Sequence, residues 1–254
     1  MSRAAAPGAV VDVGGSGIAT WRLAASSVEP FLNWEGCATP AEVGELAREA
    51  ASVGTGLLLA TPGVMDNRGL VHASNLGWAG VDLGQAVGLP DHDVRWVNDA
   101  VAIAAGERAL HGLTGNALVL TFGTGLGVAV ADESGARPLM VSDDREYGHM
   151  DTGADLACPC GRRGCAEAVG RRWLDAGIGG EVLVAAVDVM LRVARADSLV
   201  LCGGALRGGD NQQRALDLFG SRDGLRVLLS AAGNQKSAAP HGAADLWEQA
   251  RCLA

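Results

Sequence analysis

The sequence predicts an α/β fold, because short apolar strands alternate with helices along the chain. Three of the apolar runs lead directly into glycine-rich turns, and two of those turns are followed by a second apolar run. The 254 residues suffice for one large domain or two modest ones, and 48% of them are apolar, enough to form a sizeable core.

Two stretches share one pattern of strand, glycine turn and strand, and both predict β-hairpins. They are AVVDVGGSGIATWRL at 9–23 and ALVLTFGTGLGVAVAD at 117–132. A third stretch, SLVLCGGALRGG at 198–209, is an apolar strand that enters a Gly-Gly turn. The shared pattern is a weak internal similarity between two distant parts of the chain.

Helices and further strands fill the intervals between these stretches. Helices are predicted at 40–53, 100–112 and 181–197, and strands at 55–64 and 93–99. The helix at 181–197 carries apolar residues all round, so we expect it to lie in an interior or an interface.

Composition excludes several classes of function. Charged residues make up 19% of the chain and the net charge is −9, which disfavours nucleic acid, whose phosphates attract basic surfaces. The longest apolar runs are too short to span a bilayer, and the first residues lack the long apolar stretch of a secretory signal. Six cysteines do not make the chain disulfide-dense. We therefore expect a cytoplasmic protein with reduced thiols and without a membrane or nucleic-acid partner.

The glycine turns are candidates for binding phosphate. Glycine permits backbone conformations closed to other residues, and successive N–H groups in such turns converge on an anion. Neither hairpin turn fits a P-loop or the GxGxxG pattern, and the chain has a single lysine, Lys236. Asp12 and the hydroxyls of Ser16 and Thr124 favour a phosphate with Mg²⁺ beside the aspartate, and plain hairpin turns are the alternative.

Asp99 is the last residue of the strand predicted at 93–99, in the run RWVNDA, immediately before a predicted helix. In open α/β sheets, ligands bind at the carboxyl ends of the strands. A carboxylate there would accept the proton of an attacking hydroxyl in phosphoryl transfer to an alcohol. The alternative is that Asp99 caps the helix that begins at residue 100.

Three cysteines fall within the run CPCGRRGC at 158–165, and a histidine precedes them by nine residues. Three thiolates and one imidazole complete the tetrahedral shell of a structural Zn²⁺, and the C-x-C spacing differs from the C-x-x-C of redox sites. Unrelated free cysteines are the alternative. The predicted zinc ligands are His149, Cys158, Cys160 and Cys165.

The flanks of this run carry a family resemblance. EYGHMDTGADLACPCGRRGCAEAVG at 146–170 resembles the signature of the ROK family of sugar kinases and repressors. Other blocks resemble the family in the same order along nearly the whole chain. They are DVGGSGI, TPGVMDNRGLVHASNLGW, VNDA, GTGLG, LCGGAL and PHGAADLWEQA.

The resemblance implies a compact, two-lobed actin-like ATPase fold of the ribonuclease H type, with a structural zinc site and an active site between the lobes. The implied small lobe is 1–98, with a C-terminal helix at about 240–254 packed back on it, and the large lobe is 99–239. The resemblance also implies a homodimer. Two departures from the family pattern are Ser16 in place of threonine and the short interval between Cys165 and Gly203.

The resemblance also implies site residues. ATP and Mg²⁺ would be held by Asp12, Gly14, Gly15, Ser16, Gly123, Thr124, Gly125, Gly203 and Gly204. A hexose would contact Asn75, Asn98, Asp99, Glu146, His149 and Glu167. Asp99 matches the catalytic base, which takes the proton from the sugar hydroxyl, usually O6.

The implied activity is that of an ATP-dependent hexokinase of the glucokinase type. Glucose or a glucose-like sugar is the expected substrate, and N-acetylmannosamine and 3-amino-3-deoxyglucose are the alternatives. A sugar-sensing repressor is disfavoured, because repressors place a winged-helix segment before the first glycine hairpin and Asp12 lies too near the start for one. A catalytically silent sugar- or zinc-binding module is disfavoured by Asp99 and the two phosphate turns.

Overall fold

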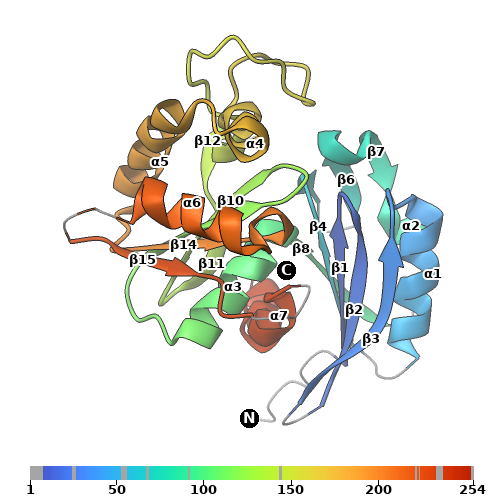
Figure 1. The fold of residues 1–254 in the computed structure, drawn as a ribbon. Helices are drawn as coiled ribbons and strands as arrows, with labels where there is room; N and C mark the ends of the chain where they lie inside the picture. The colour runs from blue at the N-terminus through green and yellow to red at the C-terminus, as the bar shows by residue number, and fades with distance from the viewer. Residues whose placement is uncertain are drawn as a thin grey trace.

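Two five-stranded sheets with the same strand order carry the fold (Figure 1). The structure is a computed structural model that describes residues 8–24, 27–52, 56–66, 69–90, 92–142, 145–220, 222, 224–232 and 237–252. The first sheet has the order β3-β2-β1-β4-β8. Its strands are β1 (Ala9–Gly14), β2 (Gly17–Leu23), β3 (Val28–Glu35), β4 (Gly56–Thr61) and β8 (Asp93–Asn98).

The second sheet repeats this arrangement in the order β11-β10-β9-β14-β15. Each sheet has a central hairpin, β1–β2 or β9–β10, flanked on one side by an antiparallel strand and on the other by two parallel strands. The two predicted hairpins are therefore confirmed. The strands are β9 (Ala117–Phe122), β10 (Leu126–Asp132), β11 (Gly135–Pro138), β14 (Ser198–Cys202) and β15 (Arg226–Leu229).

Two small sheets sit beside the main ones. One contains β5 (Val64–Met65), β6 (Leu70–Ala73) and β7 (Trp78–Asp82), and the other contains β12 (Met140–Ser142) and β13 (Arg145–Glu146). The sequence patterns did not predict these short strands. The three-stranded sheet carries a 3₁₀ turn at Ser74–Leu76, and a second 3₁₀ turn at Tyr147–His149 directly follows β13.

The helices form the outer layers and a central layer. They are α1 (Pro40–Ala51), α2 (Leu83–Val87), α3 (Asp99–His111), α4 (Ala166–Ala176), α5 (Gly180–Ala194), α6 (Gly209–Phe219) and α7 (Ala243–Cys252). The start of α1 is fixed by a capping box, in which Thr39 and Glu42 satisfy each other's backbone N–H groups. None of the described helices is long and apolar enough to cross a membrane.

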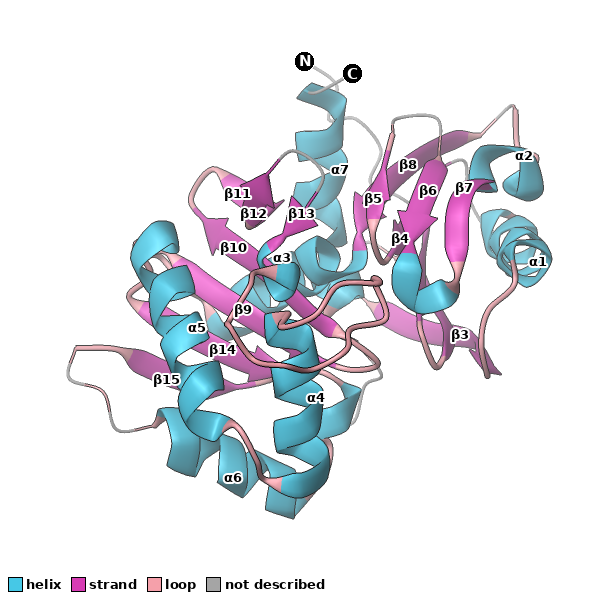
Figure 2. Cartoon of the chain, turned by 90° about the horizontal axis from the view of Figure 1, so that it is seen from above, coloured by secondary structure: helices cyan, strands magenta, loops and turns pink. Residues whose placement is uncertain are grey.

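Three apolar cores hold these layers together. One lies between the first sheet and α1 and α2, and another lies between the second sheet and α4, α5 and α6 (Figure 2). The third is shared by both sheets and by α3 and α7, which lie between them. Because α7 contacts β8 as well as α3 and β11, it touches elements of both sheets. The lobe boundary between residues 98 and 99 stays a prediction.

The long predicted helix at 181–197 is α5, and it ends at Ala194. Its apolar residues do not all lie in an interior. Leu183, Val187 and Met190 are fully buried against the second sheet, whereas Val193 is 51% exposed. An interior position is therefore wrong for one face of this helix.

Candidate active site and metal site

A cavity of about 960 Å³ lies where the two sheets meet. Its walls come from the carboxyl ends of parallel strands in both sheets, which is where open α/β sheets bind ligands. Asp12 comes from β1 and Asp99 directly follows β8, while Gly123 follows β9 and Gly203 follows β14. Segments that are distant in the sequence thus form one cleft.

The structure brings most of the predicted site residues to this cleft. All of the predicted nucleotide residues line it, and so do five of the six predicted sugar residues and two of the four predicted zinc ligands. The lining residues among these predictions are Asp12, Gly14, Gly15, Ser16, Asn75, Asp99, Gly123, Thr124, Gly125, Glu146, His149, Cys160, Glu167, Gly203 and Gly204. Asn98, Cys158 and Cys165 are not among the lining residues.

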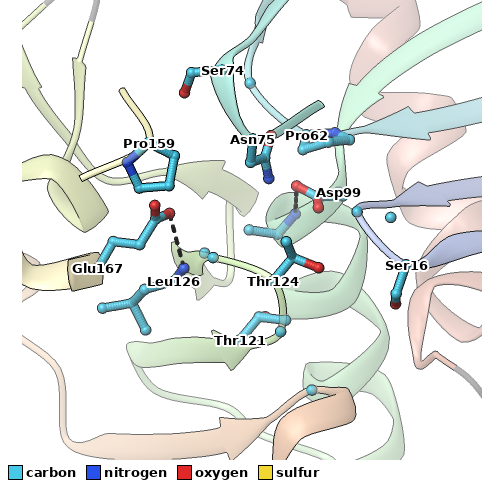
Figure 3. Close-up of a pocket in the computed structure, with 18 of the residues that line it drawn as sticks. Ser16, Pro62, Ser74, Asn75, Asp99, Thr121, Thr124, Leu126, Pro159 and Glu167 are labelled. Carbon is cyan, nitrogen blue, oxygen red and sulfur yellow. Dashed lines mark hydrogen bonds between the residues drawn. The ribbon is translucent and has the colours of Figure 1, made fainter. Parts of the chain in front are cut away.

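Asp99 is the first residue of α3, and its side chain faces the cleft (Figure 3). The helix cap is Asn98, whose side chain accepts from the N–H of Val101, so Asp99 does not serve as the cap. The Oδ1 of Asp99 accepts a hydrogen bond from the N–H of Ala100 at 2.8 Å. Loss of water around the carboxyl raises its pKa well above 3.8, and the charges of Asp12 and Glu146 raise it further.

Asn98 does not line the cleft but forms hydrogen bonds to residues that do. Its Nδ2 donates to Oε1 of Glu146 at 2.9 Å and to the carbonyl oxygen of Gly63 at 3.0 Å. These bonds tie the end of β8 to β13 and to the segment after β4. Burial and the nearby Glu167 raise the pKa of Glu146, and the bond from Asn98 opposes this shift. Asn98 thereby orients Glu146.

Glu167 connects two parts of the site. It lies in the first turn of α4 and is 4% exposed. Its Oε2 accepts a hydrogen bond from the N–H of Leu126 at 3.2 Å, and the thiol of Cys158 donates to Oε1 at 3.5 Å. Figure 3 shows Glu167 pointing toward the β9–β10 turn, with Asn75 facing the same space. The cysteine cluster is thus linked to the second glycine turn through one carboxylate.

The two glycine turns face each other across the cleft. A Cβ atom on Gly15 would lie 2.6 Å from Oγ1 and 2.7 Å from Cβ of Thr124, so the turns are in close contact. A Cβ atom on Gly125 would overlap Oε2 of Glu167. Glycine at both positions lets the hairpin turns approach closely.

Arg207 and Ser237 are two of the cleft residues that the sequence patterns did not mark. Burial raises the pKa of Asp12 to about 6, while a hydrogen bond with Ser237 and the positive charge of Arg207 oppose this shift. Both residues line the cleft. Arg207 lies four residues after Gly203 in CGGALRGG, a run that was interpreted only for its glycines, whereas nothing in the sequence marks Ser237.

The predicted zinc ligands converge. One ligand atom from each of His149, Cys158, Cys160 and Cys165 lies within 4.8 Å of all the others. The Sγ of Cys158 is 3.6 Å from Nδ1 of His149, and the Sγ atoms of Cys160 and Cys165 are 3.6 Å apart. Metal–ligand distances of about 2.3 Å for sulfur and about 2.0 Å for nitrogen give tetrahedral edges of about 3.5–3.8 Å, so the four residues fit Zn²⁺.

Local backbone geometry places these ligands. Gly161 and Gly164 have φ angles of +85° and +77°, which few other residues adopt, and they let the segment from Cys158 to Cys165 fold back on itself. A Cβ atom on Gly164 would also lie 2.8 Å from the carbonyl oxygen of Ala154. His149 is the last residue of the 3₁₀ turn that begins after Glu146. Holding His149 and Cys165 on one centre would therefore fix the separation of Glu146 and Glu167.

Replacing one ligand tests the zinc site. Cys160→Ser is expected to remove zinc and to lower the melting temperature, because metal binding is part of the folding free energy at such sites. Metal analysis of the purified protein and a thermal melt with and without chelator would measure both effects. Cys37→Ser is the control, because Cys37 is exposed and outside the cluster. Wild-type protein without zinc would refute the site.

Contact between the turns is testable by adding one methyl group. Gly15→Ala is expected to lower the free energy of unfolding by about 1–3 kcal/mol, because Thr124 must move or the turns must separate. Gly123→Ala is the matched control, since a Cβ there has no neighbour within 4 Å. Denaturant unfolding of both variants is the measurement. Equal stability of the two variants would show that the turns do not touch.

Asp12 gives a pH-dependent prediction. Because its pKa is raised from 3.8 to about 6, the folded state holds this proton more tightly than the unfolded state. The stability that the proton confers is complete below pH 3.8 and is lost as the pH rises through about 6. Asp12→Asn should therefore raise the melting temperature more at pH 8 than at pH 5. An equal gain at both pH values would contradict the burial of this charge.

The sequence is similar to that of a known sugar kinase. Kanosamine kinase of Amycolatopsis mediterranei (strain S699) is 32% identical over 177 residues, which are 63% of this chain and 57% of the kinase. The matched part thus spans little more than half of that relative.

Solved structures share the fold. A ROK family glucokinase from Streptomyces griseus, determined with glucose and AMPPNP, superposes with a TM-score of 0.72 at 21% identity and covers 94% of this chain and 98% of its own. The ROK hexokinase from Thermus thermophilus gives a TM-score of 0.68 at 22% identity, covering 93% of this chain and 96% of its own. These matches identify the predicted α/β architecture as the actin-like ATPase fold.

The sequence profile of the ROK family matches residues 41–170, and the chain belongs to the ROK family.

Proposed function

We propose that the protein is an ATP-dependent sugar kinase that transfers the γ-phosphate to a hexose hydroxyl, most simply O6 of glucose or a glucose-like sugar, with Asp99 as general base. The observation that carries the proposal is the position of Asp99 beside two facing glycine turns in one cavity. Membership of the ROK family, with sugar kinases among the relatives, supports a phosphotransferase.

The turns supply the nucleotide side of the cavity. Backbone N–H groups of the two hairpin turns would bind the phosphates, with Gly203 and Gly204 near the nucleoside. Asp12 fits Mg²⁺, because it presents a carboxylate to the cleft beside the first turn. The ion would neutralise charge on the transferred phosphoryl group. Arg207 lies close enough to Asp12 to lower its pKa, and it would add positive charge on the same side.

The opposite wall supplies the sugar side. Asn75, Glu146, His149 and Glu167 offer amide, carboxylate and imidazole groups, which recognise sugar hydroxyls by hydrogen bonds. Oδ1 of Asp99 already accepts a hydrogen bond from the N–H of Ala100. We therefore propose that Oδ2 accepts the proton of the attacking hydroxyl. The raised pKa of Asp99 makes its carboxylate a stronger base than an exposed aspartate.

An amino-sugar kinase is the second candidate. The similarity to kanosamine kinase favours it. So does the mutual repulsion of the carboxylates in the cleft, since Glu146 raises the pKa of Asp99 and Glu167 raises that of Glu146. An ammonium group on the sugar would relieve this repulsion. N-acetylmannosamine carries no such charge and would not.

Three further expectations accompany the proposal and stay predictions. They are the division into a small lobe at 1–98 and a large lobe at 99–239, the homodimer and the cytoplasmic location. Two lobes joined by one core could close over the sugar, which would exclude water and favour transfer to the sugar over hydrolysis.

Removing the base tests the catalytic assignment. Asp99→Asn should lower kcat by about 10²–10⁴-fold and leave sugar binding nearly intact, because the amide keeps the shape but cannot accept the proton. A coupled assay for ADP and calorimetric titration with sugar are the measurements. Asp93→Asn, at the exposed start of β8, is the control. Unchanged turnover in Asp99→Asn would refute the role of this residue.

A sugar panel tests the substrate class. With ATP as donor, glucose, mannose, N-acetylmannosamine and 3-amino-3-deoxyglucose would be compared by kcat/KM, with Asp99→Asn as the blank. A higher value for glucose supports the leading proposal, and a higher value for the amino sugar supports the second. Hydrolysis of ATP that no sugar stimulates would contradict both.

A further inference from the structure

Glu107 is a buried carboxylate that the proposed chemistry does not use. It lies on α3, the helix that begins with Asp99, and it is 1% exposed. Burying a charged carboxylate costs free energy unless hydrogen bonds replace the lost water. Glu107 also lies one turn before the C-terminal end of α3, where the helix dipole disfavours a negative charge. The contacts that offset these costs therefore indicate the role of this side chain.

Both carboxylate oxygens of Glu107 bind the residues that follow β15. Oε1 accepts a hydrogen bond from the hydroxyl of Ser230, and Oε2 accepts one from the N–H of Ala231 at 2.9 Å. The hydroxyl oxygen of Ser230 in turn accepts from the N–H of Ala232 at 3.2 Å. One buried side chain thus pairs with polar groups of the first residues after the strand, and it fixes the direction in which the chain leaves β15.

The residue before Glu107 contacts the same part of the chain a second time. A Cβ atom on Gly106 would lie 1.8 Å from the carbonyl oxygen of Ala238, so the two backbones are in contact. Ala238 directly follows Ser237, which is 7% exposed and lines the cleft. Two adjacent residues of α3 therefore hold the chain before and after this cleft residue.

Ser237 connects these contacts with the nucleotide side of the cleft. Its side chain forms a hydrogen bond with Asp12, the carboxylate that fits Mg²⁺. Its Oγ also accepts a hydrogen bond from the N–H of Ala239 at 3.1 Å. A displacement of Ser237 would remove a partner from Asp12 and leave the proposed sugar residues unchanged, because those residues lie on the opposite wall.

We propose that Glu107 is a positioning residue for nucleotide binding, because it holds Ser230 and Ala231 so that Ser237 reaches Asp12. Glu107 is not among the residues that line the cleft, so it would act on the nucleotide through the chain that it holds. Its effect on the nucleotide rests on the proposed kinase function, whereas its effect on Ser237 rests on the contacts alone.

Two substitutions separate positioning from charge. Glu107→Met keeps the length of the side chain but leaves the Ser230 hydroxyl and the Ala231 N–H without their acceptor. Glu107→Gln removes the charge, yet its amide can still accept from the N–H and donate to the hydroxyl oxygen. Glu107→Met should raise KM for ATP about tenfold and change Kd for the sugar by less than about twofold, and Glu107→Gln should stay near wild type. Equal increases in the two variants would overturn the proposal.

His111 supplies the matched control. Its Nε2 lies 3.0 Å from the carbonyl oxygen of Leu229, in β15, and 3.4 Å from Oε2 of Glu107. His111→Ala should therefore lower the melting temperature without raising KM for ATP. If it raises KM as much as Glu107→Met does, the role of Glu107 is merely structural and the proposal is wrong. Ser230→Ala is a milder second variant that should raise KM in the same direction, should Glu107→Met fail to fold.

Ser237→Ala tests the route. It should also raise KM for ATP, and adding Glu107→Met should raise it little further, because both changes remove the same partner of Asp12. Increases that multiply in the double variant would show that Glu107 acts elsewhere, contrary to the proposal.

Hydrogen exchange at the Ala239 amide measures the positioning without any ligand, because this N–H is bonded to Ser237. Exchange should be about tenfold faster in Glu107→Met than in wild type or His111→Ala. Unchanged exchange would overturn the positioning whatever the activity of the protein. Faster exchange in Glu107→Met, with no use of ATP by the wild type, would support the positioning and refute the proposed function.

Discussion

The cleft depends on how closely α3 packs between the two sheets. Small residues make this possible, since Ala102 and Ala104 are fully buried in the core that both sheets share. Gly106 lies so close to the backbone of Ala238 that any Cβ would overlap it, and a Cβ on Gly242 would overlap Ala105. A larger residue at these contacts would push α3 away from the 3₁₀ turn at Ala239–Gly242. Asp99 is the first residue of α3, so this packing sets the position of the carboxylate.

The repeated sheet arrangement explains why the cleft has two similar walls. Each sheet sends a hairpin turn and the carboxyl ends of parallel strands to the same edge. When α3 holds the sheets together, the turns after β1 and β9 meet, and Gly15 touches Thr124. The second wall carries an addition that the first lacks, the cysteine cluster. Glu167 lies two residues after the predicted zinc ligand Cys165 and accepts a hydrogen bond from the N–H of Leu126, so the backbone that carries the ligand is connected to the phosphate turn.

Sequence alone predicts those parts of the site that depend on local pattern. The hairpins follow from strand–glycine–strand runs, the position of Asp99 from the end of β8, and the zinc ligands from the spacing of three cysteines. What it misses depends on contacts between distant segments. Arg207 and Ser237 reach Asp12 only after the sheets have come together. Likewise, the role of Asn98 in orienting Glu146 depends on a bond across 48 residues. The exposed side of α5 was not predicted either, because apolar residues occur on every side of this helix in the sequence.

The central claim is that the cleft holds a sugar hydroxyl against Asp99 while the two glycine turns hold the phosphates. A crystal structure of the wild-type protein with a hexose and a non-hydrolysable ATP analogue measures this directly, as the distance from Oδ2 of Asp99 to the nearest sugar oxygen. The account predicts a distance of about 2.6–3.2 Å, with the γ-phosphate on the far side of that hydroxyl. A sugar bound in the cleft with its hydroxyls directed away from Asp99, or phosphates away from both turns, would contradict it.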